Sequence, residues 1–300
     1  MLLDELKSLL QKHNLWAKKR LGQNFLVDEQ ILCSIIESAE LKSSDNVIEV
    51  GPGTGFLTEK LVKNAGNVIA IERDVGMIQV LKEEFSDAEN LKIIQSDILD
   101  LSVDQMDGWI LNQVQDDKLG GGSAKKGSPF RGLGGAYKVV ANIPYYITSP
   151  LLKHFLQSDN RPEMMVLLVQ KEVAEKICGI TGKSVITIET QLFGEPEIID
   201  FVPAECFHPA PKVTSAILKI KVHKSPLVPS DQLKDFLRIV KFGFSQKRKK
   251  LKSSLSAGLH LKPSEVREVL IKLNIDPDFR AENLDIEDWK RLTTALKHVK

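Results

Sequence analysis

The sequence is poor in cysteine and has no long apolar segment. Its three cysteines, Cys33, Cys178 and Cys206, are far apart and odd in number, which predicts neither a disulfide framework nor a zinc site. No run approaches the roughly 18 uninterrupted apolar residues of a membrane span. The start of the chain mixes charged side chains with leucines, unlike a secretion signal. We therefore expect a cytoplasmic protein that holds no metal, makes no membrane contact and keeps its thiols reduced.

Neither sign of charge is in large excess, but the charges are unevenly placed. The formal net charge is +1. Residues 228–300 contain sixteen Lys or Arg and ten Asp or Glu, whereas the rest of the chain is slightly acidic. A basic end on an acidic body predicts a polyanionic partner that binds mainly to the C-terminal part. A basic surface that is only solvated is the alternative.

Apolar segments of strand length alternate with segments of helical periodicity through much of the chain. The predicted strands span residues 46–50, 68–71, 91–95, 137–141 and 164–169. Such alternation is typical of an α/β fold with a mostly parallel central sheet covered by helices on both faces. Residues 184–193 fit a strand by their β-branched content and a helix by their length.

The alternation stops near residue 222. Pro226 and Pro229 indicate a linker, and the residues after them show only helical periodicity. We therefore predict a first domain over residues 1–225 and a small all-α domain over residues 226–300. Within the first domain, residues 112–136 hold seven of the chain's nineteen glycines and little periodicity, which predicts a flexible insertion.

A glycine-rich turn follows the first predicted strand. Gly51, Gly53 and Gly55 alternate with Pro and Thr, and a helical segment begins at Phe56. A strand–turn–helix unit of this kind brings backbone N–H groups to a ligand, although the same glycines also suit a plain tight turn. The dinucleotide fingerprint requires glycine where Phe56 stands. Gly51 and Gly53 therefore favour a ligand without a pyrophosphate, such as S-adenosylmethionine.

Acidic residues end the next two strands. Glu72 lies about 20 residues after the first glycine, where nucleotide-binding folds place a carboxylate on the ribose hydroxyls. Asp97 is predicted to accept a hydrogen bond from the adenine amino group. Each residue alone is equally well explained as a solvated strand end or a helix cap. The C-terminal edge of a parallel sheet would, however, gather both at one ligand.

Asn142, Ile143, Pro144 and Tyr145 follow the fourth strand. An adenine amine is a poor nucleophile because its lone pair is delocalised into the ring. The Asn142 side-chain oxygen and a backbone carbonyl near Ile143 can each accept one of its N–H groups. Pro144 would stiffen this turn, and Tyr145 would stack on a base that has left its neighbours. A purely structural proline turn is the alternative.

Four stretches carry a family resemblance: Gln23 to Leu26, Val50 to Gly55, Asn142 to Tyr146, and Phe207 to Ser215. Together they resemble the rRNA adenine N6,N6-dimethyltransferases, in register from about Lys18 to Leu255. The resemblance implies a Rossmann-like class I methyltransferase domain, S-adenosylmethionine as the cofactor and rRNA adenine as the substrate. The small-subunit enzymes look most similar, and they dimethylate two adjacent adenosines in the 3′-terminal hairpin loop.

The resemblance also implies roles for individual residues. Asn24 and Leu26 would close over the methionine end of the cofactor, and Ile98 would lie against its adenine ring. Asn142 would contact both cofactor and target base. Phe207, which by itself would indicate core packing, would form a second aromatic wall opposite Tyr145. The residues implied in RNA binding are Lys18, Lys19, Arg20, Lys247, Arg248, Lys249 and Lys250.

The implied partner is small-subunit rRNA in an immature 30S particle, bound by a monomer. One alternative is a non-catalytic ribosome-assembly or transcription factor on the same fold. Another is the antibiotic-resistance relative that modifies large-subunit rRNA. Intact residues at the predicted site favour an enzyme: Gly51, Glu72, Asp97, Asn142 and Tyr145. The match over residues 207–215 and the long basic C-terminal segment favour the small-subunit substrate.

Overall fold

The computed structural model describes residues 2–103 and 136–296 of the 300-residue chain. The predicted insertion over residues 112–136 lies outside the described residues, apart from Ala136. The chain forms two compact units. One consists of Met1–Lys171 with Glu197–Val222, and the other of Glu172–Pro196 with His223–Lys300. The predicted division at residue 225 thus differs from these units in residues 172–196 and 223–225.

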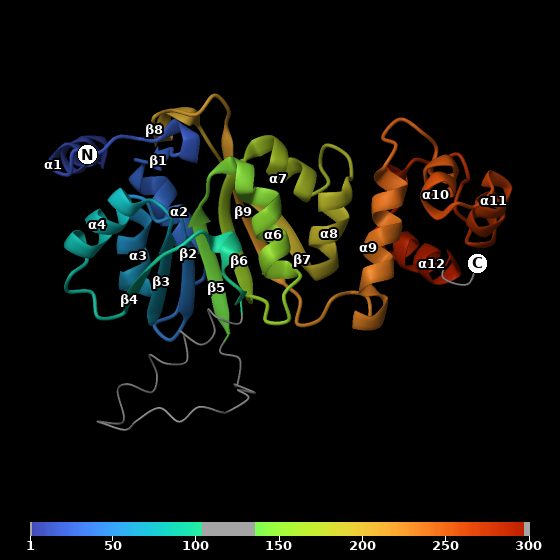
Figure 1. The fold of residues 1–300 in the computed structure, drawn as a ribbon, viewed down its shortest axis with the longest axis horizontal. Coiled ribbons are helices and arrows are strands. Elements are labelled where there is room, and N and C mark those ends of the chain that lie inside the picture. The colour runs from blue at the N-terminus through green and yellow to red at the C-terminus, as the bar shows by residue number, and fades with distance from the viewer. Residues whose placement is uncertain (1, 104–135, 297–300) are drawn as a thin grey trace, which may run out of the picture. The chain divides into compact units, whose positions relative to one another are not determined.

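A seven-stranded sheet forms the centre of the first unit (Figure 1). Its strand order is β4-β3-β2-β5-β6-β9-β7. The five strands from β4 to β6 pair in parallel, and β9 runs antiparallel to β6. Their bounds are Asn46–Val50 (β2), Asn67–Glu72 (β3), Leu91–Gln95 (β4), Tyr137–Asn142 (β5), Met164–Gln170 (β6), Gly194–Val202 (β7) and Ser215–Val222 (β9). The predicted mostly parallel α/β sheet is therefore confirmed.

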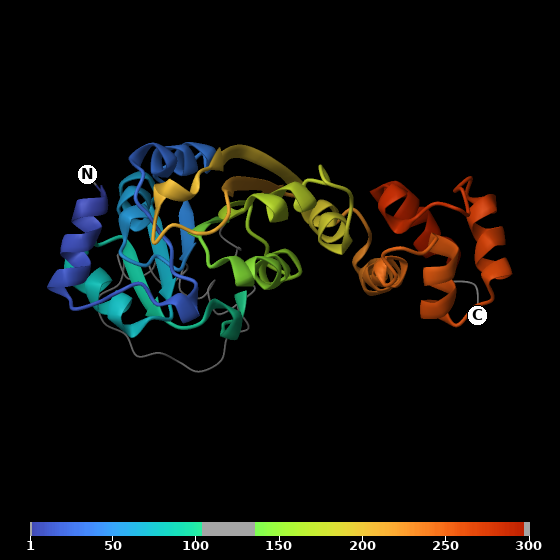
Figure 2. The same ribbon diagram turned by 90° about the horizontal axis from the view of Figure 1, so that it is seen from above.

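Helices lie on both sides of this sheet (Figure 2). They are α1 (Leu2–Lys12), α2 (Glu29–Ser38), α3 (Phe56–Asn64), α4 (Val75–Glu84) and α6 (Thr148–Leu156). Because both faces are covered, strand residues such as Val139, Val140 and Ala141 are fully buried. Short 3₁₀ helices occupy Lys19–Leu21 (η1), Ile98–Asp100 (η2), Tyr145–Ile147 (η3) and Ala204–Cys206 (η4).

The sheet changes direction of growth between β2 and β5. From β2 the chain adds β3 and then β4 on one side, and it returns to place β5 on the other side of β2. Such a switch point leaves a crevice at the carboxyl ends of the two strands, where open α/β sheets bind their ligands. A separate two-stranded ribbon joins β1 (Phe25–Leu26) to β8 (Phe207–His208).

The secondary structure of the second unit is helical, apart from the first residues of β7. The unit contains α7 (Lys171–Ile177) from its second residue, α8 (Val185–Phe193), α9 (Ser230–Phe244), α10 (Leu251–Leu259), α11 (Pro263–Lys272), the 3₁₀ helix η5 (Ala281–Asn283) and α12 (Ile286–Leu296). Trp289 is completely buried in its core, and it leaves no room for a side chain at Gly243. Residues 184–193, which suited either type of element, form a helix because Ser184 and Thr187 make a capping box at its start.

No described helix combines the length and the apolar character that a membrane crossing requires.

Candidate active site

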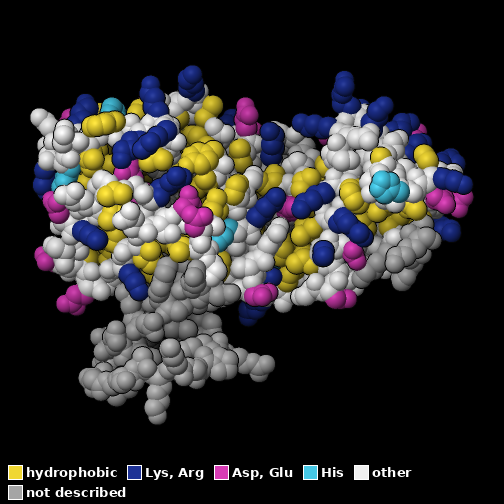
Figure 3. Space-filling view, viewed as in Figure 1, with side chains coloured by type: hydrophobic (Ala, Val, Ile, Leu, Met, Phe, Trp, Pro, Cys, Tyr) yellow, Lys and Arg dark blue, Asp and Glu magenta, His cyan; other side chains and the backbone are white. Residues whose placement is uncertain are grey.

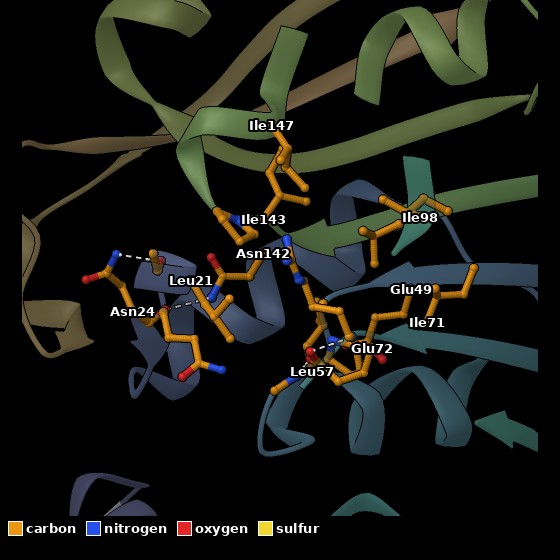
Figure 4. A pocket seen from close by; sticks show the side chains of 18 of the residues that line it. Leu21, Asn24, Glu49, Leu57, Ile71, Glu72, Ile98, Asn142, Ile143 and Ile147 are labelled. Atoms are coloured by element: carbon orange, nitrogen blue, oxygen red, sulfur yellow. Dashed lines mark hydrogen bonds between the residues drawn. The ribbon is translucent and has the colours of Figure 1, made fainter. Parts of the chain in front are cut away.

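A pocket opens at the carboxyl ends of β2, β3 and β5, beside η2 after β4 (Figure 4). The N-terminal segment over residues 21–26 forms another part of its wall. The pocket thus lies at the switch point of the sheet, where the parallel strands bring together residues far apart in the sequence. All eight predicted cofactor residues line it: Asn24, Leu26, Gly51, Gly53, Glu72, Asp97, Ile98 and Asn142.

The glycine-rich turn requires residues without a side chain. Gly51, Gly53 and Gly55 all adopt positive φ angles, of 68°, 58° and 94°, which L-residues with a side chain rarely tolerate. A Cβ atom on Gly53 would lie 3.1 Å from the Phe25 ring, and one on Gly51 would lie 3.9 Å from the Asn142 carbonyl oxygen. The tight turn itself therefore requires these glycines. They also leave the backbone without side chains at the edge of the pocket.

Glu72 is fixed by three backbone N–H groups. Its Oε1 accepts hydrogen bonds from the amides of Arg73 and Asp74, both at 2.8 Å, and its Oε2 accepts one from Gly53 at 3.2 Å. Only 5% of the residue is exposed, and this burial raises its pKa even though the three donors oppose the shift. Carboxylate oxygens retain further lone pairs, so this group can still accept hydrogen bonds from a ligand in the pocket.

Asp97 caps η2 and is held by an arginine that the sequence patterns did not single out. Its Oδ1 accepts a hydrogen bond from the Leu99 amide at 3.1 Å, and its Oδ2 lies 3.1 Å from the Arg73 guanidinium. The same Arg73 nitrogen lies 3.4 Å from the Tyr146 hydroxyl. Arg73 therefore links the β4 side of the pocket to the turn after β5. Its place directly after Glu72 is the signal that could have identified it.

A second residue that the sequence analysis missed is Glu49. This β2 residue lines the pocket, is 1% exposed and accepts a hydrogen bond from the Thr58 hydroxyl at 2.6 Å. Burial raises the pKa of Glu49 to about 8, and the nearby charge of Glu72 adds to the effect, whereas the Thr58 bond opposes it. An acidic residue inside an otherwise apolar strand was the available signal.

The turn after β5 holds its functional groups through contacts with distant segments. The Asn142 amide nitrogen donates to the Asn24 carbonyl at 3.2 Å, which leaves its side-chain oxygen free to accept. Pro144 directly precedes η3. The Tyr145 hydroxyl lies 2.6 Å from the Ser215 hydroxyl on β9, and burial raises the pKa of Tyr145. Tyr145 lines the pocket with its hydroxyl already engaged.

Phe207 lies in the core in this conformation. Its strand β8 pairs with β1, so that Phe207 stands opposite Leu26, and it is only 3% exposed. Leu26 lines the pocket and Phe207 does not. The ribbon thus supports the pocket wall from behind. The second aromatic wall that the family resemblance implied stays a prediction.

The predicted RNA-binding residues of the N-terminal segment differ in their surroundings. The Lys18 ammonium donates to Asp74 at 2.6 Å, and Gln23 donates to the other oxygen of Asp74 at 3.0 Å. Although burial alone would raise it, these bonds hold the pKa of Asp74 below its usual range. Lys19 and Arg20 are exposed. Lys18 therefore anchors the segment, and the next two residues present their charges to solvent.

The basic cluster of the second unit occupies the exposed loop between α9 and α10. Lys247, Arg248 and Lys249 are exposed, whereas Lys250 and Lys252 both bind Asp278 at 2.9 Å. The hydrogen bonds from these two lysines lower the pKa of Asp278 to about 2. The positive charge of Lys250 is thus partly compensated within the protein.

Comparison with known proteins identifies the family. The family model described as ribosomal RNA adenine dimethylase matches residues 14–298. The chain belongs to the ribosomal RNA adenine dimethylase family. The predicted family, its enzymatic activity and its methyl donor, S-adenosylmethionine, are thereby confirmed for this dimethylase.

Three relatives show how far the similarity extends. A protein from Dehalococcoides mccartyi named ribosomal RNA small subunit methyltransferase A is 38% identical, over 97% of this chain and 92% of its own length. The crystal structure of the 23S rRNA methyltransferase ErmE is 27% identical, with a TM-score of 0.68 over 92% of this chain and all of that one. A dimethyladenosine transferase from Plasmodium falciparum is 27% identical, with a TM-score of 0.67 over 88% of this chain and 94% of that chain.

The residues of this dimethylase fit S-adenosylmethionine. Backbone without side chains at Gly51 and Gly53 permits close approach of the ligand, and Glu72 and Asp97 supply acceptors at two separate strand ends. The apolar wall includes Ile98, which is 3% exposed. Among the residues that the structure describes, no group of three or more His, Cys, Asp or Glu is placed to hold a metal ion.

Proposed function

We propose that this dimethylase methylates N6 of two adjacent adenosines in the 3′-terminal hairpin loop of small-subunit rRNA, while the rRNA is part of an immature 30S particle. The observation that carries the proposal is the proximity of the two strand ends at the switch point. Gly51 after β2 faces the carbonyl of Asn142 at the end of β5, with 3.9 Å between that oxygen and the place of a Gly51 Cβ. Cofactor and target base would thus share one pocket.

The cofactor would bind along the ends of β2, β3 and β4. Glu72 would accept from the ribose hydroxyls, and Asp97 from the adenine amino group, with Ile98 against the ring. Gly51 and Gly53 would allow the ligand to approach the backbone. Asn24 and Leu26, on the N-terminal segment, would cover the methionine end. Support comes from the position of all these residues on the wall of a single pocket.

The target adenine would bind at the turn after β5. The Asn142 amide nitrogen is engaged by Asn24, so its oxygen can accept one N–H of the adenine amine. The carbonyl of Ile143 would accept the other N–H. Tyr145 would stack on the base, since its hydroxyl is fixed on Ser215 and its ring is held in place. A base must leave its stack in the RNA to reach such a pocket.

Positioning would supply most of the rate enhancement. S-adenosylmethionine, when bound, provides an electrophilic methyl group on a positively charged sulfur. Two acceptors on the amine would hold the nitrogen lone pair toward that methyl group, and Pro144 would keep the turn rigid. The pKa of Tyr145 is raised and its hydroxyl is occupied, so it is poorly suited to remove a proton. Orientation and electrostatic preorganisation then replace a strong general base.

The small subunit is favoured over the large one as the source of the substrate. The relative named after the small subunit is 38% identical to this chain, whereas the structural neighbour named after 23S rRNA is 27% identical. The match to the small-subunit relative also extends over 97% of this chain, including the basic C-terminal segment.

The test uses purified ribosomal subunits from cells that lack this modification. The protein is incubated with S-adenosylmethionine and with small subunits, large subunits or partly assembled small subunits. Digested rRNA is then analysed for N6,N6-dimethyladenosine by mass spectrometry. We expect two dimethylated residues in the 3′-terminal hairpin of the small subunit and the fastest reaction with the partly assembled particle. Methylation confined to large subunits, or absent from all three, would overturn the proposal.

A further inference from the structure

Trp16 exposes its indole to solvent. Of its surface, 65% is accessible, an unusual state for the side chain with the largest apolar area. Of the other two tryptophans, Trp289 is fully buried and Trp109 lies outside the described residues. A single exposed apolar side chain is common and marks no site by itself. The surroundings of Trp16 indicate which partner this surface would bind.

The backbone on both sides of Trp16 is held against the first unit. The Leu15 amide donates to the Leu10 carbonyl at 2.8 Å, and the Leu15 side chain packs so closely on Gly76 that a Cβ there would lie 2.7 Å away. On the other side, Lys18 binds Asp74 through its ammonium and Gln23 through its amide. The indole is therefore presented by an anchored segment.

Two cations follow Trp16 in the same segment. Lys19 and Arg20 are exposed, and within the part of the chain that the structure describes neither forms an ion pair. On the face shown in Figure 3, apolar and basic side chains are interspersed over the first unit. An aromatic platform next to uncompensated positive charge suits single-stranded nucleic acid, whose bases stack on the ring while its phosphates meet the cations.

The segment leads directly into the active-site pocket. Leu21, five residues after Trp16, is the first of the run over residues 21–26 that lines the pocket. Five residues of chain span at most about 18 Å. At the same rim, Tyr146 is 57% exposed and its ring lies 3.4 Å from the place of a Gly22 Cβ. Trp16 thus lies within about 18 Å of a residue that lines the pocket.

We propose that Trp16 stacks on an unpaired rRNA base that flanks the target adenosine, while Lys19 and Arg20 bind the adjoining phosphates. This inference rests on the proposed function, because it assumes that the target adenosine enters this pocket and that its neighbour in the RNA lies close by. Tryptophan and arginine are also enriched at protein interfaces, so a protein partner is the other occupant that the test below separates from RNA. The stacked base would help to hold the RNA strand open beside the pocket.

The test compares Trp16→Ala and Trp16→Phe with the parent protein. Binding is measured with a protein-free fragment of small-subunit rRNA that contains the terminal hairpin, and the KM for unmodified small subunits is measured in parallel. Loss of one stacked base weakens binding by about 1–3 kcal/mol, which corresponds to roughly 5- to 150-fold. We expect that loss for Trp16→Ala with both substrates. Trp16→Phe retains a stacking face, so its affinity should stay within about threefold of the parent.

Three controls separate stacking from other effects. Affinity for S-adenosylmethionine, measured by calorimetry, should be the same in all variants. Phe201→Ala removes another exposed aromatic residue of the first unit, on the edge strand β7 and 42% exposed, and should leave RNA binding unchanged. Lys19→Ala with Arg20→Ala should reduce the slope of log K against log salt by about 0.7 for each phosphate that is no longer bound, whereas Trp16→Ala should leave that slope unaltered.

Several outcomes would overturn the inference. RNA binding by Trp16→Ala at parental affinity would refute it, and so would equal losses in Trp16→Ala and Trp16→Phe. Weakened binding to the whole subunit, with normal binding to the protein-free rRNA, would assign Trp16 to a ribosomal protein. Failure of the proposed function looks different: the parent itself would then leave small subunits unmethylated.

Discussion

The two sides of the pocket are held in different ways. On the cofactor side, the Glu72 carboxylate receives three hydrogen bonds from backbone amides within its own and the neighbouring turn. On the base side, the Asn142 amide is held by the Asn24 carbonyl and the Tyr145 hydroxyl by Ser215, from segments 118 and 70 residues away. The cofactor side is thus preorganised locally, whereas the base side depends on the completed fold.

This difference has a chemical reason. A cofactor of constant shape can be bound by backbone groups whose positions follow from strand and turn geometry. Under the proposed function, the base side has to admit a nucleotide that has left its stack in the RNA and to release it after methylation. Contacts made by single side chains across the pocket can hold the turn and still be separated at modest cost. We expect substitutions on the two sides to affect different steps.

The largest effect is expected for Asn142→Ala. Loss of one of two acceptors on the target amine should lower kcat by about 10²–10³-fold, the range measured when a single preorganised group is removed. The affinity for S-adenosylmethionine should remain close to that of the parent. Single-turnover methylation of small subunits gives the first quantity and calorimetry the second. Equal losses in both would show that Asn142 acts mainly on the cofactor.

A pH-dependent effect on stability is expected from Glu49. Its folded-state pKa of about 8 lies above the ordinary value of 4.5, so the folded protein keeps a proton that the unfolded chain loses. The free energy of unfolding should therefore fall as pH rises from about 5.5 to 7.5, by about 2–3 kcal/mol. Glu49→Gln should remove this component. Urea unfolding of both proteins without cofactor tests it, and parallel pH profiles would contradict it.

Glu72→Gln should weaken the cofactor side specifically. The amide of Gln has one acceptor oxygen instead of two, and its NH₂ group would face backbone N–H groups. Loss of a hydrogen bond to a charged acceptor costs about 1.5–3 kcal/mol. We expect affinity for S-adenosylmethionine to fall by roughly 10- to 150-fold, with kcat at saturating cofactor largely kept. Unaltered affinity in calorimetry would mean that Glu72 serves the turn alone. Glu59→Gln, a half-buried acid on α3 that pairs with Lys63, is the matched control.

Ser215→Ala should have a smaller effect, confined to the base side. It removes the partner of the Tyr145 hydroxyl at 2.6 Å without changing the ring. A neutral hydrogen bond contributes about 0.5–1.5 kcal/mol, so the KM for small subunits should rise by roughly 2- to 13-fold. Affinity for the cofactor should not change. Tyr145→Phe should resemble Ser215→Ala, whereas Tyr145→Ala should be far worse if stacking is the role of the ring.

The second unit allows a finer comparison between two neighbouring lysines. Both lysines are exposed, but Lys250 shares Asp278 with Lys252. If the loop binds RNA phosphate, Lys249→Gln should reduce the salt dependence of RNA binding by about one phosphate contact. Lys250→Gln should reduce it less, because part of that charge is already compensated. Equal slopes for the parent and both variants would leave this loop as ordinary surface.

Much of the cofactor side could be predicted from the sequence. Glu72 and Asp97 follow apolar runs of strand length, and parallel strands place their carboxyl ends at one edge. Gly51 and Gly53 have no side chain because the turn needs positive φ angles there. Such features depend on local periodicity and on a general rule of sheet topology, so the pocket and its occupant could be inferred before any coordinates.

Contacts between distant segments were beyond the reach of sequence patterns. The sequence does not indicate that Arg73 contacts Asp97 and Tyr146, because only the fold brings these residues together. Lys18 is indistinguishable from Lys19 in sequence, yet it is bound to Asp74. The core position of Phe207 follows from the pairing of β8 with β1, across some 180 residues.

Local sequence accounts for the alternation of strands and helices, the glycine turn and the acids at the strand ends, because each depends on neighbours in the chain. Which polar groups stay available to a ligand depends on the complete fold. It engages the amide nitrogen of Asn142 and leaves its oxygen available, and it neutralises Lys18 and leaves Lys19 exposed. The partners in these hydrogen bonds and ion pairs are far apart in the chain. No local sequence pattern therefore indicates which of them the fold will bring together.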